Sequence, residues 1–318
     1  MKILVTGASG FLGSWFCRVL SENHEVTALV RKDSDIFRIS NLKNIDIQRI
    51  NPENWHKFII ENNFEVFVFN DWWGVGNKFR NDERQFENVF RFKELVGVSN
   101  KSSTKLIVGI GSQAELGPVS GSILENQVDN PTTQYGMAKV AAREALLNEE
   151  LKPNIRKAWL RVFSTYGPLD SSGWLLTDTI ENLLNNKTME FTKGEQIWSY
   201  LHAFDLANAL QFIIKNETIS GIINAGNPTT NKISEIIQLI GDKLSKENLI
   251  KIGALPYRED QVMELHPKCE KLINAGWNPQ INLEDGLINL IDWFKGIDSP
   301  IKLNNGEIID LHIPKKRN

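Results

Sequence analysis

Residues 2–13, Lys-Ile-Leu-Val-Thr-Gly-Ala-Ser-Gly-Phe-Leu-Gly, decide the fold of this chain. The stretch begins with a short apolar run that ends at Gly7, which is typical of a buried parallel strand. From Phe11 onward, apolar residues recur at helical spacing. Glycines at such a junction allow a tight turn, a close approach of the backbone to a pyrophosphate, and close packing of the helix on the strand. The stretch therefore predicts a dinucleotide-binding loop whose contact residues are Gly7, Ser9, Gly10, Phe11, Leu12 and Gly13.

Strand and helix patterns alternate through the first half of the chain. Short apolar runs indicate strands at 2–6, 25–30, 45–50, 66–69, 104–110 and 155–163, and helix patterns lie between them at 11–22, 53–62, 80–99 and 132–150. This alternation predicts an α/β fold, a Rossmann-type doubly wound parallel sheet with helices on both faces.

After residue 165 the alternation is interrupted by Gly-Pro and Ser-Ser-Gly segments. We predict a smaller α+β substrate lobe there. The dinucleotide-binding domain is expected to take residues 1–165, with 197–225 returning to it, and the lobe to take 166–196 and 226–318. The last twenty residues, rich in Lys, Asn and Pro, are expected to pack poorly.

Composition excludes several classes of protein. The chain has 318 residues, a formal charge of −3 and only two cysteines, Cys17 and Cys269. A near-neutral surface gives no reason to expect a nucleic acid or an anionic membrane as partner, and the cysteine spacing suggests neither a disulfide framework nor a metal site. No apolar run approaches the roughly 18 residues of a membrane helix, and a strand pattern follows Met1 directly, without room for a signal peptide. We expect a cytoplasmic protein.

Arg31 follows the second predicted strand, where an acidic residue usually holds the ribose hydroxyls of NAD. An arginine at this point suits a 2′-phosphate instead, so the sequence favours NADP(H), with NAD(H) possible. A solvent-facing arginine at a strand end is the alternative interpretation.

Tyr135 and Lys139 lie four residues apart in a predicted helix, and therefore on one face of it. A phenol with a pKa of about 10 is a poor acid–base catalyst at neutral pH, and a nearby cation is expected to lower that pKa. Ser112 follows the fifth predicted strand, at the sheet edge where ligands gather in open α/β folds. Its hydroxyl can hydrogen-bond a substrate oxygen on which charge develops. Together the three residues form a candidate catalytic group.

Several motifs together resemble one enzyme family. The chain is similar to extended short-chain dehydrogenase/reductases, and within them to the NAD(P)-dependent epimerase/dehydratase group that acts on nucleotide sugars. The resemblance covers nearly all of residues 1–296. Its motifs are the glycine loop, Gly111-Ser112-Gln113-Ala114-Glu115-Leu116-Gly117, Tyr135 to Lys139, Leu160 to Pro168, Gly194-Glu195-Gln196, Tyr200-Leu201-His202, Asp205, Arg258 and Gly276-Trp277-Asn278-Pro279.

The resemblance implies roles for individual residues. Tyr135 would be the general acid and base, Lys139 its partner, and Ser112 the ligand of the substrate oxygen. Arg258 would hold the diphosphate of a sugar nucleotide, a role that suits a guanidinium fork; a surface salt bridge is the alternative. Further cofactor contacts are expected at Asn51, Trp72, Asn88 and Phe163, and further substrate contacts at Trp73, Gln113, Ser164, Trp174 and Trp198.

The sequence also departs from the family pattern. Gln113 and Ala114 stand where dehydratases carry an acidic pair, which argues against a 4,6-dehydratase because loss of water needs a further acid and base. Trp72 and Trp73 replace small residues after the fourth strand, one expected in packing and one in a pocket wall. Trp198 and Ser164 stand where many relatives carry arginine and asparagine, so the usual way of holding the diphosphate is in doubt.

Three functions are compatible with these residues. The first is NADPH-dependent reduction of a nucleotide-linked 4-keto-6-deoxy sugar, with Tyr135 as proton donor. The alternative is an NAD-dependent nucleotide-sugar 4-epimerase, which uses the same three residues but retains its cofactor. A non-catalytic NADP(H)-binding sensor is the third. The resemblance also implies a homodimer through the helices near 80–99 and 132–150, whose apolar faces could equally pack within one chain.

Overall fold

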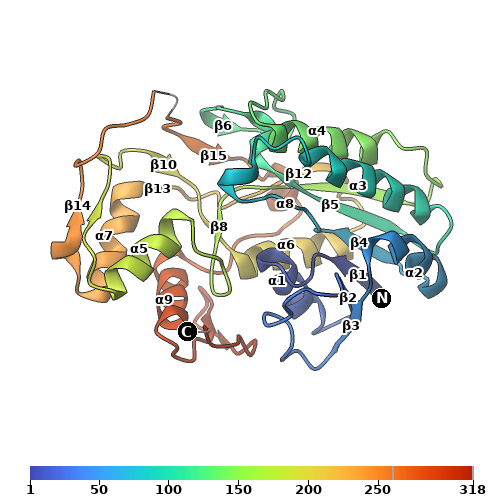
Figure 1. Cartoon of the computed structure of the whole chain (residues 1–318), viewed down its shortest axis with the longest axis horizontal. Coiled ribbons are helices and arrows are strands. Elements are labelled where there is room, and N and C mark those ends of the chain that lie inside the picture. The colour runs from blue at the N-terminus through green and yellow to red at the C-terminus, as the bar shows by residue number, and fades with distance from the viewer. Residues whose placement is uncertain (260, 317–318) are drawn as a thin grey trace.

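The computed structural model describes residues 1–259 and 261–316, and its centre is a seven-stranded parallel sheet (Figure 1). The strand order is β12-β7-β5-β4-β1-β2-β3. The strands are β1 Lys2–Thr6, β2 Glu25–Val30, β3 Ile45–Arg49, β4 Val66–Phe69, β5 Leu106–Ser112, β7 Arg156–Val162 and β12 Gly221–Ala225. This arrangement confirms the predicted fold class.

The order of the strands locates the ligand-binding edge. β1 pairs with β2 on one side and with β4 on the other, so the chain reverses its direction of travel across the sheet at β1. In open α/β sheets, ligands bind outside the carboxyl ends of the strands at such a reversal. The segments that follow β1, β4 and β5 therefore lie where a dinucleotide is expected.

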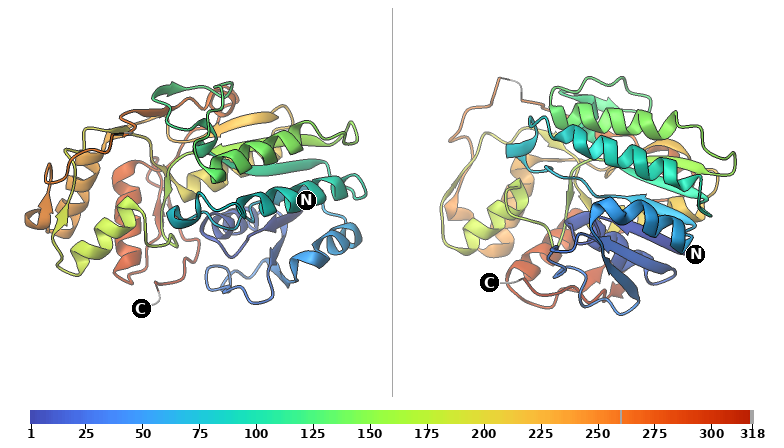
Figure 2. Two further views of the ribbon diagram at one scale, coloured as in Figure 1. Left: turned by 45° about the horizontal axis from the view of Figure 1, so that its top comes forward. Right: turned by 45° about the vertical axis from the view of Figure 1, so that its right-hand side comes forward.

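Helices cover both faces of the sheet (Figures 1 and 2). One face carries α1 (Phe11–Leu20) and α6 (Ala203–Lys215), and the other carries α2 (Trp55–Asn62), α3 (Gln85–Ser99) and α4 (Gln134–Leu147). The predicted helix over 80–99 begins only at Gln85, because the preceding residues form consecutive turns. Residues 80–84 thus belong to a loop at the sheet edge, which bears on the site below.

The second lobe, at the left of Figure 1, is built from α5 (Leu175–Leu184), α7 (Ile233–Leu244) and α9 (Leu283–Phe294) around an apolar cluster of their own. Outside the large sheet the structure also has five short strand pairs, and α8 (Glu270–Asn274) packs on β12 in the sheet half. The pairs are β6 (Gly121–Ile123) with β15 (Leu265–Pro267), β8 (Thr165–Tyr166) with β11 (Leu201–His202), β9 (Met189–Glu190) with β14 (Ile250–Lys251), β10 (Ile197–Trp198) with β13 (Asn231–Lys232), and β16 (Ile301–Lys302) with β17 (Ile308–Ile309).

The segment 197–225 divides between the two halves. α6 and β12 lie in the sheet half, but β10 pairs with β13 of the lobe and β11 pairs with β8. The chain turns at Ser199, whose hydroxyl donates to the carbonyl oxygen of Asn227 at 2.7 Å. Residues 197–202 therefore do not join the large sheet, contrary to our expectation that the whole segment would belong to the dinucleotide-binding domain.

The C-terminal segment packs against both halves as far as residue 316, which corrects the expectation of a poorly packed tail; residues 317–318 lie outside the described residues. Ile301, Leu303 and Leu311 are buried in the cluster beneath α1 and α6. The indole of Trp293 donates to the carbonyl oxygen of Pro314 at 2.8 Å, and Lys316 forms an ion pair with Glu181. The polar composition of the segment obscured these few apolar anchors. Over the described residues, no helix combines the length and apolar character needed to cross a membrane.

Candidate active site

The glycine loop after β1 is shaped for close contact. Gly7 has a φ of +61°, and a Cβ on it would lie 2.8 Å from the backbone of Asp71. A Cβ on Gly13 would lie 2.2 Å from the carbonyl oxygen of Gly7. Gly10 is the N-cap of α1 and supplies no side-chain cap, so the first amides of this helix are available to a phosphate. The loop thus fits the pyrophosphate of a dinucleotide.

An acidic residue missed by sequence reasoning lies beside this loop. The backbone amides of Asn70 and Asp71 both donate to the hydroxyl of Thr6 at 3.1 Å, which fixes the end of β4 against β1. The buried carboxylate of Asp71 pairs with Arg91 at 2.5 Å and with Arg31 at 3.9 Å. Arg31 is half exposed at the end of β2, as expected, but a carboxylate accompanies it.

Arg38 is a second residue that the sequence did not reveal. Its guanidinium donates to the carbonyl oxygens of Leu169 at 2.7 Å and Ser9 at 3.5 Å, and to the hydroxyl of Ser171 at 3.1 Å. It therefore joins the glycine loop to the first segment of the lobe. Asn51, expected near the cofactor, is exposed after β3 and begins a short 3-10 turn.

Ser112 and Tyr135 meet at the carboxyl edge of β5. Ser112 is the last residue of β5, and its hydroxyl lies within hydrogen-bonding reach of the Tyr135 phenol. The same hydroxyl accepts the backbone amide of Ala114 at 3.2 Å. Gln113, the next residue, is half-buried, and its Oε1 has no hydrogen-bond partner among the described residues. The predicted pair of hydroxyls is thus brought together.

Lys139 lies one turn beyond Tyr135 on α4, and the structure buries it. Its ammonium donates to the carbonyl oxygen of Ile110 at 2.7 Å and lies 3.6 Å from the ring centroid of Trp72. The distance from the ammonium to the centroid of the Tyr135 ring is 5.7 Å. Burial lowers the pKa of Lys139 to about 7. Burial thus disfavours the charged form of this lysine, while the Ile110 carbonyl and the Trp72 ring contact its ammonium.

The expectation that Lys139 lowers the pKa of Tyr135 needs correction. Burial raises the pKa of the Tyr135 phenol, because it removes water that would stabilise the phenolate. The hydrogen bond from Ser112 and the charge of Arg80 act in the opposite direction. Burial was not visible in the local spacing of Tyr135 and Lys139, and it affects the charged forms of both residues.

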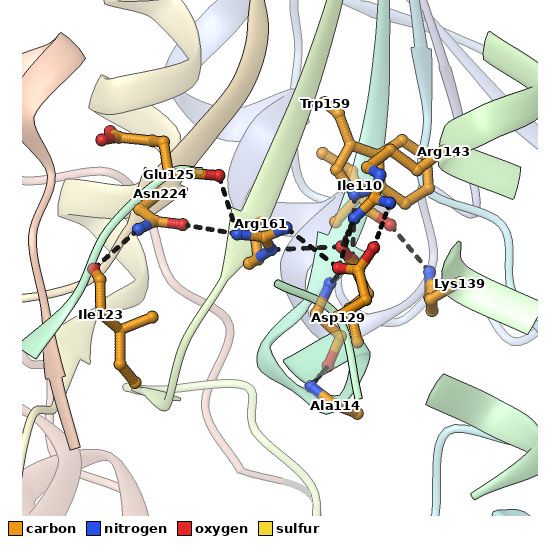
Figure 3. Close-up of polar contacts among 12 residues, drawn as sticks. Ile110, Ala114, Ile123, Glu125, Asp129, Lys139, Arg143, Trp159, Arg161 and Asn224 are labelled. Atoms are coloured by element: carbon orange, nitrogen blue, oxygen red, sulfur yellow. Dashed lines mark hydrogen bonds and ion pairs between the residues drawn. The ribbon is translucent and has the colours of Figure 1, made fainter. Parts of the chain in front are cut away.

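The side chain of Glu115 fixes the backbone of Ser112. Its completely buried carboxylate accepts the backbone amide of Ser112 at 2.7 Å and the indole of Trp159 at 2.9 Å. The same carboxylate pairs with Arg161 at 3.2 Å and Arg143 at 3.3 Å. Figure 3 shows how Arg143 and Arg161 converge here with Asp129, which pairs with Arg143 at 2.5 Å. Ser112 and Glu115 form a capping box, a Ser-x-x-Glu pattern that could have been recognised in the sequence.

Two tryptophans follow β4, and one of them contacts Tyr135. Trp72 lies edge-on to Tyr135 with 6.2 Å between ring centroids, and Trp73 packs on Phe79 at 5.1 Å. The buried side chain of Asn88 accepts the backbone amide of Trp73 at 2.8 Å and donates to its carbonyl oxygen at 3.1 Å. Asn88, expected to contact the cofactor, thus fixes the backbone of this aromatic pair.

The residues expected to contact substrate are dispersed. Trp198 donates through its indole to the hydroxyl of Ser164 at 2.8 Å, which brings these two together. Trp174 is half-buried at the start of α5, and Arg258 is exposed, with no ion pair among the described residues. Phe163, expected near the cofactor, is buried in a small cluster with Leu116 and other apolar side chains.

Comparison with known proteins agrees with this architecture. A putative UDP-glucose 4-epimerase of Methanocaldococcus jannaschii is 25% identical over 92% of this chain and 98% of the relative. The CDP-abequose synthase of Salmonella muenchen is 22% identical over 91% of this chain and 97% of the relative. The crystal structure of UDP-glucuronic acid 4-epimerase from Bacillus cereus with NAD matches the fold with a TM-score of 0.81 at 21% identity, over 93% of this chain and 96% of that one.

A sequence model supplies the assignment. The model described as the NAD dependent epimerase/dehydratase family matches residues 3–226, which include the glycine loop, Ser112, Tyr135 and Lys139. The match spans well over half of the chain and confirms the resemblance seen in the sequence motifs. This chain therefore belongs to the NAD dependent epimerase/dehydratase family.

Proposed function

We propose that the protein is a nucleotide-sugar 4-epimerase that retains NAD through the catalytic cycle. The observation that carries the proposal is the meeting of Ser112, Tyr135 and Lys139 at the sheet edge beside an uncapped glycine loop. This arrangement places a proton donor and acceptor next to a site shaped for a dinucleotide. Bound NAD would supply an acceptor and then a donor of hydride.

The residues of the chain handle the proton. Tyr135 takes the proton of the C4 hydroxyl of the sugar as C4 is oxidised. After the keto sugar has rotated to present its other face, Tyr135 returns a proton to the same oxygen. Ser112 holds that oxygen by a hydrogen bond in both half-reactions. The buried Lys139 ammonium, which donates to the Ile110 carbonyl and contacts the Trp72 ring, can hold a ribose hydroxyl.

The comparisons and one ion pair support NAD and epimerisation. The sequence had instead favoured NADP(H) and reduction. Two of the three relatives described above are named 4-epimerases, and the solved one holds NAD. In this chain the carboxylate of Asp71 faces Arg31 at 3.9 Å. The carboxylate partly neutralises Arg31, the residue on which the preference for a 2′-phosphate rested, so it favours NAD.

A specific observation keeps NADPH-dependent 4-keto reduction as the second candidate. Arg31 is half exposed, and with Arg91 it leaves one net positive charge around Asp71, which suits a 2′-phosphate. One relative is named a CDP-abequose synthase. The positions of Gln113 and Ala114 lack the acidic pair expected of a dehydratase, which either candidate tolerates.

The cofactor separates the two candidates. We expect the purified protein to release NAD on denaturation and to interconvert a nucleotide hexose with its 4-epimer without net consumption of cofactor. NMR of the anomeric protons follows the inversion, with UDP-glucose, UDP-glucuronic acid and UDP-N-acetylglucosamine as the first substrates. Stoichiometric NADPH consumption with a nucleotide 4-keto sugar would establish the reductase instead. Failure to bind either pyridine nucleotide would exclude both.

We also propose that the protein is a homodimer through α3 and α4, which lie side by side on one face (Figure 2). The outward side chains Phe90 and Met137 are 71% and 41% exposed, which is costly for large apolar groups on a monomer surface. Light scattering should give a dimer for the unaltered protein and a monomer for Phe90→Asp. Leu255→Asp, at an exposed apolar position in the lobe, is the control and should stay dimeric.

A further inference from the structure

We propose that Arg80 is a second cationic partner of Tyr135 beside Lys139, and that its unpaired guanidinium stabilises the phenolate form of this tyrosine during proton transfer. The inference rests on the proposed function, because it assigns a role within the same site. It concerns a residue outside the glycine loop, the Ser112–Tyr135–Lys139 group and the expected substrate contacts.

The backbone anchors Arg80 to the catalytic helix. Arg80 follows the 3-10 turn Asn77–Phe79, in the loop that precedes α3. Its carbonyl oxygen accepts the backbone amide of Tyr135 at 2.8 Å, in the first turn of α4. The guanidinium carbon of Arg80 lies 5.2 Å from the centroid of the Tyr135 ring. The backbone of Arg80 is therefore tied to the first turn of α4, and its guanidinium lies over the Tyr135 ring.

No carboxylate neutralises this charge. Within residues 1–259 and 261–316, Arg80 forms no ion pair, and its buried Nε has no hydrogen-bond partner. Neighbouring arginines differ: Arg84 pairs with Asp82 at 2.6 Å, and Arg91 pairs with Asp71. An unpaired guanidinium in a partly buried position exerts its field on the nearest ionisable group, since neither a counter-ion nor bulk water screens it fully.

Arg80 adds to the other groups that face Tyr135. From β5, the Ser112 hydrogen bond lowers the pKa of Tyr135, but it carries no charge. From the 3-10 turn after β5, the Glu115 carboxylate raises that pKa. From α4 itself, the Lys139 ammonium lies 5.7 Å from the ring centroid, and burial lowers the pKa of Lys139 to about 7. A guanidinium stays protonated at every working pH, so Arg80 keeps a positive charge beside the phenol.

The reaction explains why such a charge is useful. When Tyr135 donates its proton to the oxygen on the sugar, the O–H bond of the phenol breaks and the electron pair stays on the phenolate. Burial disfavours that anion, as the raised pKa of Tyr135 shows. A fixed cation over the ring offsets the loss of water in both directions of the proton transfer.

The test is a direct titration of the phenol. The chain has only four tyrosines, so biosynthetic labelling with difluorotyrosine gives four fluorine NMR signals, each assignable by a Tyr→Phe substitution. The fluorine atoms lower the pKa of every phenol and bring its midpoint into the range where proteins stay folded. We expect Arg80→Met to raise the titration midpoint of Tyr135 by about 1 pH unit or more. Arg80→Lys should stay near the unaltered protein, and the matched control Arg84→Met should not move the midpoint.

The outcomes are distinct. Equal Tyr135 midpoints in Arg80→Met and the unaltered protein would overturn the assignment, and so would equal rises in Arg80→Met and Arg80→Lys, because the effect would then not follow charge. Circular dichroism checks folding, and Arg80→Gln replaces Arg80→Met if the latter does not fold. The titration needs neither substrate nor cofactor. The proposed function instead fails through absent pyridine-nucleotide binding, so the two failures are distinguishable.

Discussion

The two halves of the molecule are held together by different kinds of contact. In the sheet half, β5 and β7 pair through a register of seven residues, and apolar side chains fill both faces. In the lobe, β8, β10 and their partners are two residues long, and three helices supply the core. The residues that we propose to handle protons lie on β5 and α4, whereas the expected substrate contacts lie mostly on short strands and loops. The proposed chemistry thus lies on the half with long strands, and the proposed recognition mostly on the half in which loops can vary.

The largest effect is expected from a substitution that removes the proposed acid–base group and leaves the lobe unchanged. Tyr135→Phe removes the phenol oxygen but keeps the ring that packs on Trp72. We expect turnover to fall about 10²–10⁴-fold, the usual contribution of a general acid and base, while pyridine-nucleotide binding persists. Steady-state kinetics and a fluorescence titration measure the two quantities. Tyr257→Phe, the same substitution at a lobe residue that contacts Glu195, is the control and should keep most of the turnover.

The second prediction concerns the stability of the rigid half. Glu115→Gln leaves Arg161, which is completely buried, with the more distant Asp129 at 3.7 Å as its one carboxylate partner among the described residues. Breaking a buried ion pair from one side costs about 3–5 kcal/mol, so we expect a loss near 3 kcal/mol in urea unfolding. Glu144→Gln removes an exposed partner of Arg143 and should cost less than about 1 kcal/mol. Similar losses in both variants would contradict the view that Glu115 is central to this network.

The third prediction tests the junction between the halves by pH. His202 is buried between Trp15 of the sheet half and Asn289 of the lobe, and burial lowers its pKa to about 3. Its Nδ1 accepts the backbone amide of Phe204, so the native ring is neutral. The unfolded chain binds a proton below pH 6.5 and the native chain does not, so stability is full above that pH and is lost as the pH falls.

This linkage has a definite size. Between pH 7 and pH 5 the unaltered protein should lose about 2 kcal/mol of unfolding free energy through His202. His202→Gln should lower stability at pH 7 but flatten this dependence, which urea unfolding at the two pH values detects. If the unfolding free energy of the variant depends on pH as steeply as that of the unaltered protein, burial of His202 at the junction is not the cause of the dependence.

The smallest effect is expected from a substitution that tests whether the lobe contributes to substrate binding. Trp198→Phe removes the hydrogen bond to Ser164 and should cost about 1 kcal/mol of stability. Because both residues lie on the expected substrate side, we expect KM to rise several-fold with kcat nearly unchanged. Trp293→Phe, which loses an equivalent indole bond to Pro314, is the matched control. It should lose similar stability and leave KM unaltered, and an equal rise in KM for both variants would remove Trp198 from the binding surface.

The sequence predicted the sheet well because its signals are local. Apolar runs such as Leu106–Ile110 and the glycine loop depend only on neighbours along the chain, and so does the spacing of Tyr135 and Lys139. The residues that surround these groups depend on distant partners. Glu115 meets Arg161 across 46 residues, and Arg38 meets Leu169 across 131. No local pattern encodes such pairs, although the Ser-x-x-Glu sequence at Ser112 indicated the cap.

Burial was the second quantity that spacing could not give. The expectation for the pKa of Tyr135 considered the nearby charge but not the loss of water on burial. That loss disfavours the charged forms of both Tyr135 and Lys139. The helix expected from residue 80 placed Arg80 on a regular surface, whereas the turns before Gln85 direct it toward Tyr135. The lobe was predicted least well, since strands of two residues leave almost no periodicity to detect.

The C-terminal segment has a consequence for biosynthesis. Ile301, Leu303 and Leu311 complete the apolar cluster beneath α1, and Asn41, in the loop after β2, donates to the carbonyl oxygen of His312. The sheet half emerges from the ribosome first, and N-terminal domains generally fold during synthesis. Here that half keeps part of its apolar surface uncovered until residues 301–311 can pack on it. A nascent chain stalled before residue 301 should therefore be a substrate for chaperones.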